Sequence, residues 1–108
     1  MKHYGLQGSF AAQKGKGREL AGIMCDASKL MDNADGCRLY MVALDKENED
    51  RVLITEVWDS KQDHDDSLNY PGVRELIAKA MPLMDGRPQK GTEMHVIGGV
   101  DCSEGMRE

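Results

Sequence analysis

The chain has few cysteines, and their spacing excludes two common kinds of site. Only Cys25, Cys37 and Cys102 occur among its 108 residues. An odd number at wide separations fits neither a disulfide framework nor a pair of metal ligands in a Cys-x-x-Cys motif. A nucleophilic cysteine would also need an activating base beside it. We therefore interpret the three cysteines as reduced structural or surface thiols.

Long apolar runs and excess positive charge are missing as well. No stretch approaches the roughly 20 apolar residues of a membrane span, and residues 1–10 lack the apolar region and cleavage site of a signal peptide. The formal net charge is −5, which argues against binding to nucleic acids or anionic membranes. The sequence thus predicts one cytoplasmic domain that binds neither nucleic acid nor a membrane.

The spacing of apolar residues predicts four strands and three helices. Alternation along the chain predicts strands at 4–12, 37–45, 51–59 and 92–100. Apolar stripes and capping residues predict helices within 18–36, 61–68 and 72–81. The polar run 45–50 is interpreted as a hairpin tip, and 101–108 as a polar tail.

The element order β-α-β-β-α-β predicts an α+β, ferredoxin-like fold, whose helices cover one face of an antiparallel sheet. The other face of such a sheet is polar in a monomer. In the strand at 51–59, Ile54 and Trp58 lie on one face. Leu53 and Val57 lie on the other. Because both faces are apolar, we expect two copies to pack their sheets face to face as a homodimer.

Three segments carry a resemblance to a known family: "GCRLY" at 36–40, "RVLITEVWDS" at 51–60 and "YPGVREL" at 70–76. With these segments at gap-free separations, the chain resembles the antibiotic biosynthesis monooxygenase domain, a family that includes quinol monooxygenases. The likeness covers nearly all of residues 4–100, and "EVW" is its most distinctive part. We therefore expect a single domain of this kind over residues 1–108.

The resemblance implies both an architecture and a reaction. Two copies form a dimeric α+β barrel, with a pocket in each subunit between sheet and helices. Members oxidise phenols, hydroquinones and anthrones with molecular oxygen, and they use no metal, flavin or haem. The protein then has to bind a flat aromatic, help to deprotonate it and stabilise the negative charge. We therefore predict a cofactor-independent monooxygenase acting on a small quinol or polyphenol.

Two positions depart from the family pattern. Many members have a histidine nine residues after the tryptophan, where this chain has Ser67, and an aromatic residue or histidine after the proline, where it has Gly72 and Val73. His64 lies one helical turn before Ser67 and could substitute. The haem-degrading branch of the family has a tryptophan where this chain has Ser67 and a histidine where it has Ile77, so haem degradation is not expected.

Glu56 shares a strand face with Ile54 and Trp58, so we expect its side chain to point into the protein. One interpretation is structural: the carboxylate pairs with Arg38 or another base on the neighbouring strand, because buried carboxylates are usually paired. The other is functional: its pKa is raised, and it accepts a phenolic proton. Both interpretations stay open on sequence alone.

Two histidines are candidates for a catalytic base, His64 and His95, because imidazole titrates near neutral pH. The candidate substrate-binding residues are Tyr40, Trp58, Ser67 and Tyr70. The two tyrosines could orient a substrate oxygen, and the tryptophan is interpreted as core or pocket wall.

Two polar clusters resemble ligand sites but have simpler interpretations. Consecutive residues of "DHDD" at 63–66 point in different directions on a helix, so they cannot converge on one ion and no metal site is predicted. "KGKGR" at 14–18 lacks a Walker or dinucleotide pattern and is interpreted as a loop before the first helix. The eight methionines are interpreted as core filling, although a methionine-rich pocket would also adapt to flat ligands.

Two other functions stay open. The same fold resembles isomerases and lyases of small polar metabolites, and such chemistry needs an acid–base pair that His64 and Glu56 could supply. The second alternative hypothesis is a non-catalytic ligand-binding dimer. Ser67 in place of the family histidine favours these two, whereas the apolar, methionine-rich composition favours an aromatic ligand.

Overall fold

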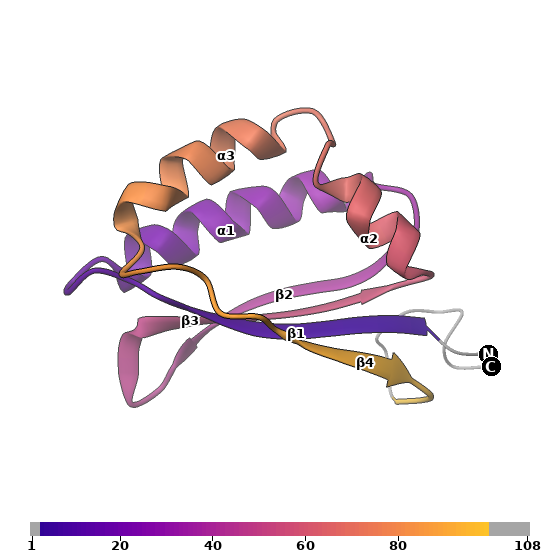
Figure 1. Ribbon diagram of the computed structural model, residues 1–108, viewed down its shortest axis with the longest axis horizontal. Coiled ribbons are helices and arrows are strands. Elements are labelled where there is room, and N and C mark those ends of the chain that lie inside the picture. Colours follow the sequence, from indigo (N-terminus) through magenta and orange to yellow (C-terminus); the bar gives the residue numbers. More distant parts are fainter. Residues whose placement is uncertain (1–2, 100–108) are drawn as a thin grey trace.

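The strands and helices follow one another in the order that the sequence predicts (Figure 1). The computed structural model describes residues 3–99. Its strands are β1 (His3–Ala11), β2 (Cys37–Asp45), β3 (Asn48–Trp58) and β4 (Thr92–Val96). Its helices are α1 (Gly17–Met31), α2 (Lys61–Ser67) and α3 (Val73–Ala80), followed by a 3-10 turn, η1 (Met81–Leu83). The last strand is shorter than predicted, and the tail with Cys102 lies outside the described residues.

The four strands form one antiparallel sheet in the order β2-β3-β1-β4. In Figure 1, α1 and α3 lie side by side over one face of the sheet, and α2 lies at one end of it. This arrangement confirms the α+β, ferredoxin-like fold. Across β1 and β3, Tyr4 pairs with Trp58 and Leu6 pairs with Glu56. Paired residues share a sheet face, so all four side chains lie on the face that the helices cover.

The core between the sheet and the helices consists of two separate clusters of buried residues. The first contains Ala12, Leu20, Val52, Ile54 and Ala80. The second contains Met31, Trp58 and Val73. Tyr40 of β2 packs against both clusters. The helices therefore pack on the sheet through two clusters, and side chains only partly fill the space between these clusters.

The hairpin between β2 and β3 is tighter than the sequence predicts. Asp45 pairs with Asn48, so only two residues lie at the tip. The acidic residues that follow belong to β3, and their side chains bind the start of α1. The carboxylate of Asp50 accepts hydrogen bonds from the backbone N–H groups of Gly15 and Gly17, each at 3.0 Å. The hairpin thus fixes the first turn of the helix that covers the sheet.

The same contact explains the glycine-rich segment before α1. An added Cβ at Gly17 would lie 1.7 Å from the carbonyl oxygen of Glu49, so the close approach of the two chain segments requires glycine here. The carboxylate of Glu49 accepts two hydrogen bonds from the guanidinium group of Arg18, at 3.0 and 2.8 Å. Carboxylates of β3 therefore occupy the N-terminus of α1.

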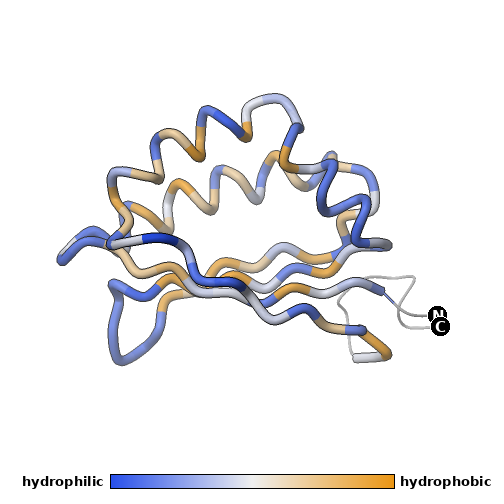
Figure 2. Tube along the Cα trace, in the orientation of Figure 1, coloured by the Kyte–Doolittle hydropathy of each residue, from blue (hydrophilic) through white to orange (hydrophobic). Residues whose placement is uncertain are grey.

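The outer face of the sheet, turned away from the helices, is mainly apolar on β2 and β3 and carries polar residues such as Gln7 and Ser9 on β1. On β2, Leu39 and Met41 point to this face, and on β3 Leu53 does. Met41 is 49% exposed, and no described residue covers it. Figure 2 shows apolar segments recurring along the strands, whereas the β2–β3 hairpin and α2 are hydrophilic. Among residues 3–99, no helix is long and apolar enough to cross a membrane.

Candidate active site

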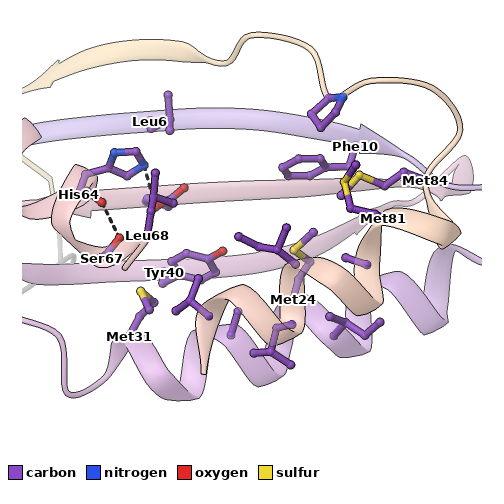
Figure 3. A pocket seen from close by; sticks show the side chains of 18 residues that line it. Leu6, Phe10, Met24, Met31, Tyr40, His64, Ser67, Leu68, Met81 and Met84 are labelled. Atoms are coloured by element: carbon purple, nitrogen blue, oxygen red, sulfur yellow. Dashed lines mark hydrogen bonds and ion pairs between the residues drawn. The ribbon is translucent and has the colours of Figure 1, made fainter. Parts of the chain in front are cut away.

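A cavity of about 330 Å³ lies between the sheet and the helices, bordered by members of both core clusters. This volume is in the range of small-molecule sites. Side chains from three strands and all three helices line it. In Figure 3, His64 and Ser67 lie at one end, and Phe10, Met81 and Met84 lie at the other. The cavity is therefore polar at one end and apolar along the rest of its length.

The register of the sheet brings Tyr40 and Glu56 to the polar end. These two residues are direct partners across β2 and β3, and Leu6 of β1 pairs with Glu56 on its other side. The helix α2 supplies His64 and Ser67, which lie three positions apart and so share one side of the helix. Four of the residues that the sequence singled out are thus brought together around one end of the cavity.

Glu56 is held inside the protein by a neighbour on its own strand. The indole Nε1–H of Trp58 donates a hydrogen bond to Glu56 Oε1 at 3.0 Å, and His64 Nε2 lies 3.8 Å from the same oxygen. The glutamate side chain is only 12% exposed. Burial raises the pKa of the Glu56 carboxyl, while the hydrogen bond from Trp58 and the nearby His64 act in the opposite direction.

The pairing of Glu56 with Arg38 that the sequence suggested is wrong. The Nε atom of Arg38 donates to Asp59 at 2.5 Å. The base nearest to Glu56 is His64, which comes from α2 and not from the neighbouring strand. The structural and the functional interpretation of Glu56 are therefore compatible, because Trp58 holds the carboxylate from the core while His64 approaches it from the lining of the cavity.

The ring of His64 lies in an aromatic environment. Its centroid is 5.5 Å from that of Tyr4 and 6.0 Å from that of Trp58, with the tryptophan edge-on at 79°. Its Nδ1 lies 3.0 Å from Asp65 Oδ1. Ser60 is the N-cap of α2, and its hydroxyl oxygen accepts a hydrogen bond from the backbone N–H of the third residue of the helix. This cap fixes the direction in which α2 presents the histidine to the cavity.

The hydroxyl groups at the polar end have different roles. Ser67 is buried, and its hydroxyl donates a hydrogen bond to the carbonyl oxygen of His64 at 2.5 Å. The hydroxyl proton of Ser67 is therefore used in a hydrogen bond to the helix backbone. Burial and the nearby Glu56 raise the pKa of the Tyr40 phenol, so this hydroxyl keeps its proton at neutral pH. Tyr40 can therefore donate a hydrogen bond to an oxygen atom of a ligand.

Three candidates lie outside the lining of this cavity. Trp58 is completely buried behind Glu56 and acts as its hydrogen-bond donor. Tyr70 lines a separate surface pocket together with Asn33 and Asp35. His95 is exposed on the edge strand β4, where it pairs with Tyr4 in the β1–β4 ladder. Of the two histidine candidates, only His64 reaches the cavity.

The apolar end of the cavity was not identified from the sequence. Four methionines line the cavity: Met24, Met81 and Met84 lie toward its apolar end, and Met31 lies nearer Tyr40 (Figure 3). The helical spacing of Met24 and Met31 had been interpreted as core packing, and a face that borders a cavity has the same spacing. Around the cavity, Leu68, Ile77 and Met81 are 49%, 45% and 54% exposed. Adaptable thioether side chains and an exposed apolar rim are suited to flat ligands of varied outline.

The described residues provide no obvious metal site. Between residues 3 and 99, no three histidine, cysteine, aspartate or glutamate side chains lie close enough together to hold one ion. The carboxylates of "DHDD" instead bond along α2, where Asp65 accepts from Lys61 at 3.0 Å and Asp66 accepts from Gln62 at 2.8 Å.

Known proteins share both sequence and fold with this chain. The sequence profile of the family described as "Antibiotic biosynthesis monooxygenase" matches residues 4–79. A Chloroflexus aurantiacus protein named for that family is 35% identical, with a TM-score of 0.80 over 90% of this chain and 95% of that one. A structure from Caulobacter crescentus is 18% identical, with a TM-score of 0.80 over 89% and 91% of the two chains. One from Nitrosomonas europaea is 8% identical, with a TM-score of 0.82 over 88% and 90%. Comparison with curated protein sequences gives no significant match.

Proposed function

Because this chain belongs to the antibiotic biosynthesis monooxygenase family, we propose that it oxidises a small quinol or polyphenol with molecular oxygen and without a bound cofactor. The cavity carries the proposal, because it joins a long apolar space to one polar end with Tyr40, Glu56 and His64. A flat aromatic ring with an ionisable hydroxyl group matches a cavity that is apolar along most of its length and polar at one end. The hydroxyl meets the polar residues, and the ring lies against the methionines.

The first step is removal of a proton from the bound hydroxyl group. His64 Nε2 accepts this proton, and Glu56, whose oxygen lies 3.8 Å away, stabilises the imidazolium that forms. Tyr40 donates a hydrogen bond to the substrate oxygen as its negative charge develops. The aromatic and apolar walls exclude water, which strengthens each of these interactions.

The second step is the reaction of the resulting anion with oxygen. The electron-rich ring transfers electrons to dioxygen, and a carbon–oxygen bond forms at a ring carbon. The oxygen–oxygen bond then breaks, one oxygen atom stays in the product, and the other leaves as water. One hydroquinone and one dioxygen give one hydroxyquinone and one water, so all four electrons come from the substrate. The reaction balances without an external reductant.

The assembly that we propose is a cytoplasmic homodimer. The outer sheet face carries apolar side chains on β2 and β3, namely Leu39, Met41 and Leu53, and Met41 is 49% exposed. Packing this face against the same face of a second copy removes it from water. The helix-covered face, which carries the cavity, is on the opposite side of the sheet.

Oxygen consumption tests the proposal directly. The purified protein is mixed in air with hydroquinones, catechols and anthrones, and oxygen uptake is compared with the rate of autoxidation and with heated protein. We expect uptake above autoxidation for at least one substrate class. Glu56→Gln should lower kcat by about 10- to 100-fold, less than the roughly 10²- to 10⁴-fold contribution of a direct acid or base, because Glu56 acts through His64. If the protein binds members of the panel without oxygen uptake, the monooxygenase proposal is wrong.

The two histidine candidates are separated by paired substitutions. His64 lines the cavity, whereas His95 is exposed on β4. His64→Gln removes the proposed proton acceptor, so it should lower kcat by about 100-fold or more. His95→Gln should have the smaller effect. The opposite order would move the base to β4 and contradict the assignment of His64.

An acid–base isomerase or lyase is the second candidate, favoured by the closeness of His64 and Glu56. Such an enzyme would act on a small polar metabolite, however, and most of the cavity lining is apolar. Calorimetric titration separates the two, because an aromatic ligand should bind more tightly than a polar metabolite of the same size. Preference for the polar ligand would favour the isomerase or lyase.

A further inference from the structure

The imidazole of His64 lies between two carboxylates that belong to different environments. On the cavity side, Nε2 is 3.8 Å from Oε1 of the buried Glu56. On the other side, Nδ1 is 3.0 Å from Oδ1 of Asp65, whose side chain is 45% exposed. Only the second distance is that of a hydrogen bond. The two ring nitrogens are therefore not equivalent, because Nδ1 has a hydrogen-bond partner in Asp65.

Asp65 is itself held in place. Lys61 Nζ, one helical turn earlier, donates a hydrogen bond to Asp65 Oδ2 at 3.0 Å. Contacts with His64 and Lys61 lower the pKa of the Asp65 carboxyl, so it is ionised at neutral pH. An ionised carboxylate only accepts hydrogen bonds. The contact at 3.0 Å therefore requires the proton of the neutral ring to lie on Nδ1.

The opposite nitrogen remains available. Glu56 Oε1 already accepts the indole N–H of Trp58. At 3.8 Å it does not form a hydrogen bond with Nε2. With the ring proton on Nδ1, the Nε2 atom has a lone pair directed toward the polar end of the cavity. This is the tautomer that can accept a proton from a bound hydroxyl group.

We propose that Asp65 is a positioning residue: it holds the Nδ1–H tautomer of His64 and so presents Nε2 to the cavity as the proton acceptor. This inference rests on the proposed function and extends it by one residue. When the substrate hydroxyl gives up its proton, the new N–H bond forms at Nε2 and the substrate becomes an anion. The imidazolium then lies between the carboxylates of Glu56 and Asp65. Asp65 does not touch the substrate and acts only through the histidine.

Groups on the other elements around His64 are compatible with this arrangement. From β1, Tyr4 presents its ring, and its hydroxyl donates to Glu93 of β4 at 2.9 Å. From β3, Glu56 and Trp58 face the histidine. The charged groups that face the ring directly are carboxylates, and they favour the cation that forms during proton transfer.

The test is the tautomer of His64, read from the nitrogen NMR shifts of its imidazole ring without substrate. Spectra are recorded at about pH 8.5, above the ordinary titration range of histidine. The His64 signals are assigned by their loss in His64→Gln. We expect Nδ1–H in the wild type. Asp65→Asn presents an amide that can donate to Nδ1, so the proton should move to Nε2. Asp66→Asn, the neighbouring carboxylate on α2, should leave the tautomer unchanged.

Turnover provides the second measurement. Asp65→Asn should lower kcat by about 10- to 100-fold with little change in KM, and Asp65→Glu should restore part of the loss. The proposal is overturned if wild-type His64 carries its proton on Nε2, if Asp65→Asn leaves the tautomer as it was, or if Asp66→Asn lowers kcat equally. The tautomer is measured without substrate, so a protein that oxidises no quinol contradicts the proposed function while the NMR result still decides the role of Asp65.

Discussion

Glu56 shows how a single residue connects packing with chemistry. Its side chain is mostly buried, and burial raises the pKa of its carboxyl. The hydrogen bond from Trp58 keeps one oxygen in place, and His64 lies beside that same oxygen. A carboxylate in this position costs stability when it ionises, and that cost is characteristic of a group retained for its chemistry.

The effect of Glu56 on stability should depend on pH. Because its pKa is raised in the folded state above the ordinary value of 4.5, the contribution of Glu56 to the stability of the folded form is greatest below that value and is lost as the pH rises through the folded pKa. Glu56→Gln keeps a side chain of the same shape without this ionisation. We expect the variant to gain in free energy of unfolding relative to the wild type between about pH 4 and pH 8.

Urea unfolding across that pH range measures the difference in free energy of unfolding between the wild type and Glu56→Gln. Glu75→Gln, at an exposed position of α3, is the matched control and should show no comparable trend. A wild type that instead gains stability relative to Glu56→Gln as the pH rises would mean that the folded state lowers the pKa of Glu56.

The direction of Glu56 was predictable from the sequence, but its partners were not. Alternation along the strand places it on the face of Ile54 and Trp58, and the structure has it there. The partner on β2 could not be inferred, because a register shift between Cys37 and Leu39 disturbs the regular pairing around Arg38. The sequence contains no signal for such a bulge. His64 comes from α2, whose position on the sheet depends on the whole fold.

At the scale of elements, the β2–β3 hairpin determines where α1 begins. Asp50 accepts hydrogen bonds from two backbone N–H groups near the helix N-terminus. These groups have no partner within the helix, and a carboxylate also interacts favourably with the helix dipole. The acidic run was interpreted from composition as a loop tip. Only residues 46 and 47 form the tip; the rest of the run belongs to β2 and β3, and the carboxylates of Glu49 and Asp50 have partners near α1 that only the tertiary structure brings near.

Removing this carboxylate should destabilise the protein. Asp50→Ala leaves the N–H groups of Gly15 and Gly17 without their acceptor, and we expect a loss of about 1–2 kcal/mol in the free energy of unfolding. Glu47→Ala, an exposed position at the hairpin tip, should change it by less than about 0.5 kcal/mol. Urea denaturation measures both. Equal effects of the two substitutions would show that Asp50 does not anchor α1.

At the scale of the whole molecule, the two faces of the sheet differ in what they contact. The helix-covered face contains the cavity, and the outer face leaves Met41 49% exposed. The fold and the apolar outer face could be predicted from the order and period of the strands. The cavity was expected only from the family resemblance, because the spacing of the residues themselves gives no signal for it. Met24 and Met31 follow the same helical spacing as core residues, and spacing does not show whether facing side chains meet or leave a void.

The dimer that we propose can be tested on its outer face. Met41→Glu places a charge among the apolar side chains of the outer face, so we expect the dissociation constant of the homodimer to rise by at least about tenfold. Ala78→Glu adds the same charge at an exposed position of α3 and should leave the assembly unchanged. Sedimentation equilibrium measures both. If the wild type is a monomer at micromolar concentration, the outer face does not serve as the proposed interface.

The most direct test of the proposed reaction uses isotopically labelled dioxygen. A quinol that supports oxygen uptake is turned over under labelled gas, and the product is analysed by mass spectrometry beside a reaction with Glu56→Gln. We expect one labelled oxygen atom in each product molecule and one water formed for each dioxygen consumed. The variant should form the same product more slowly. A product without label, or equal rates with and without the protein, would contradict a monooxygenase built on this cavity.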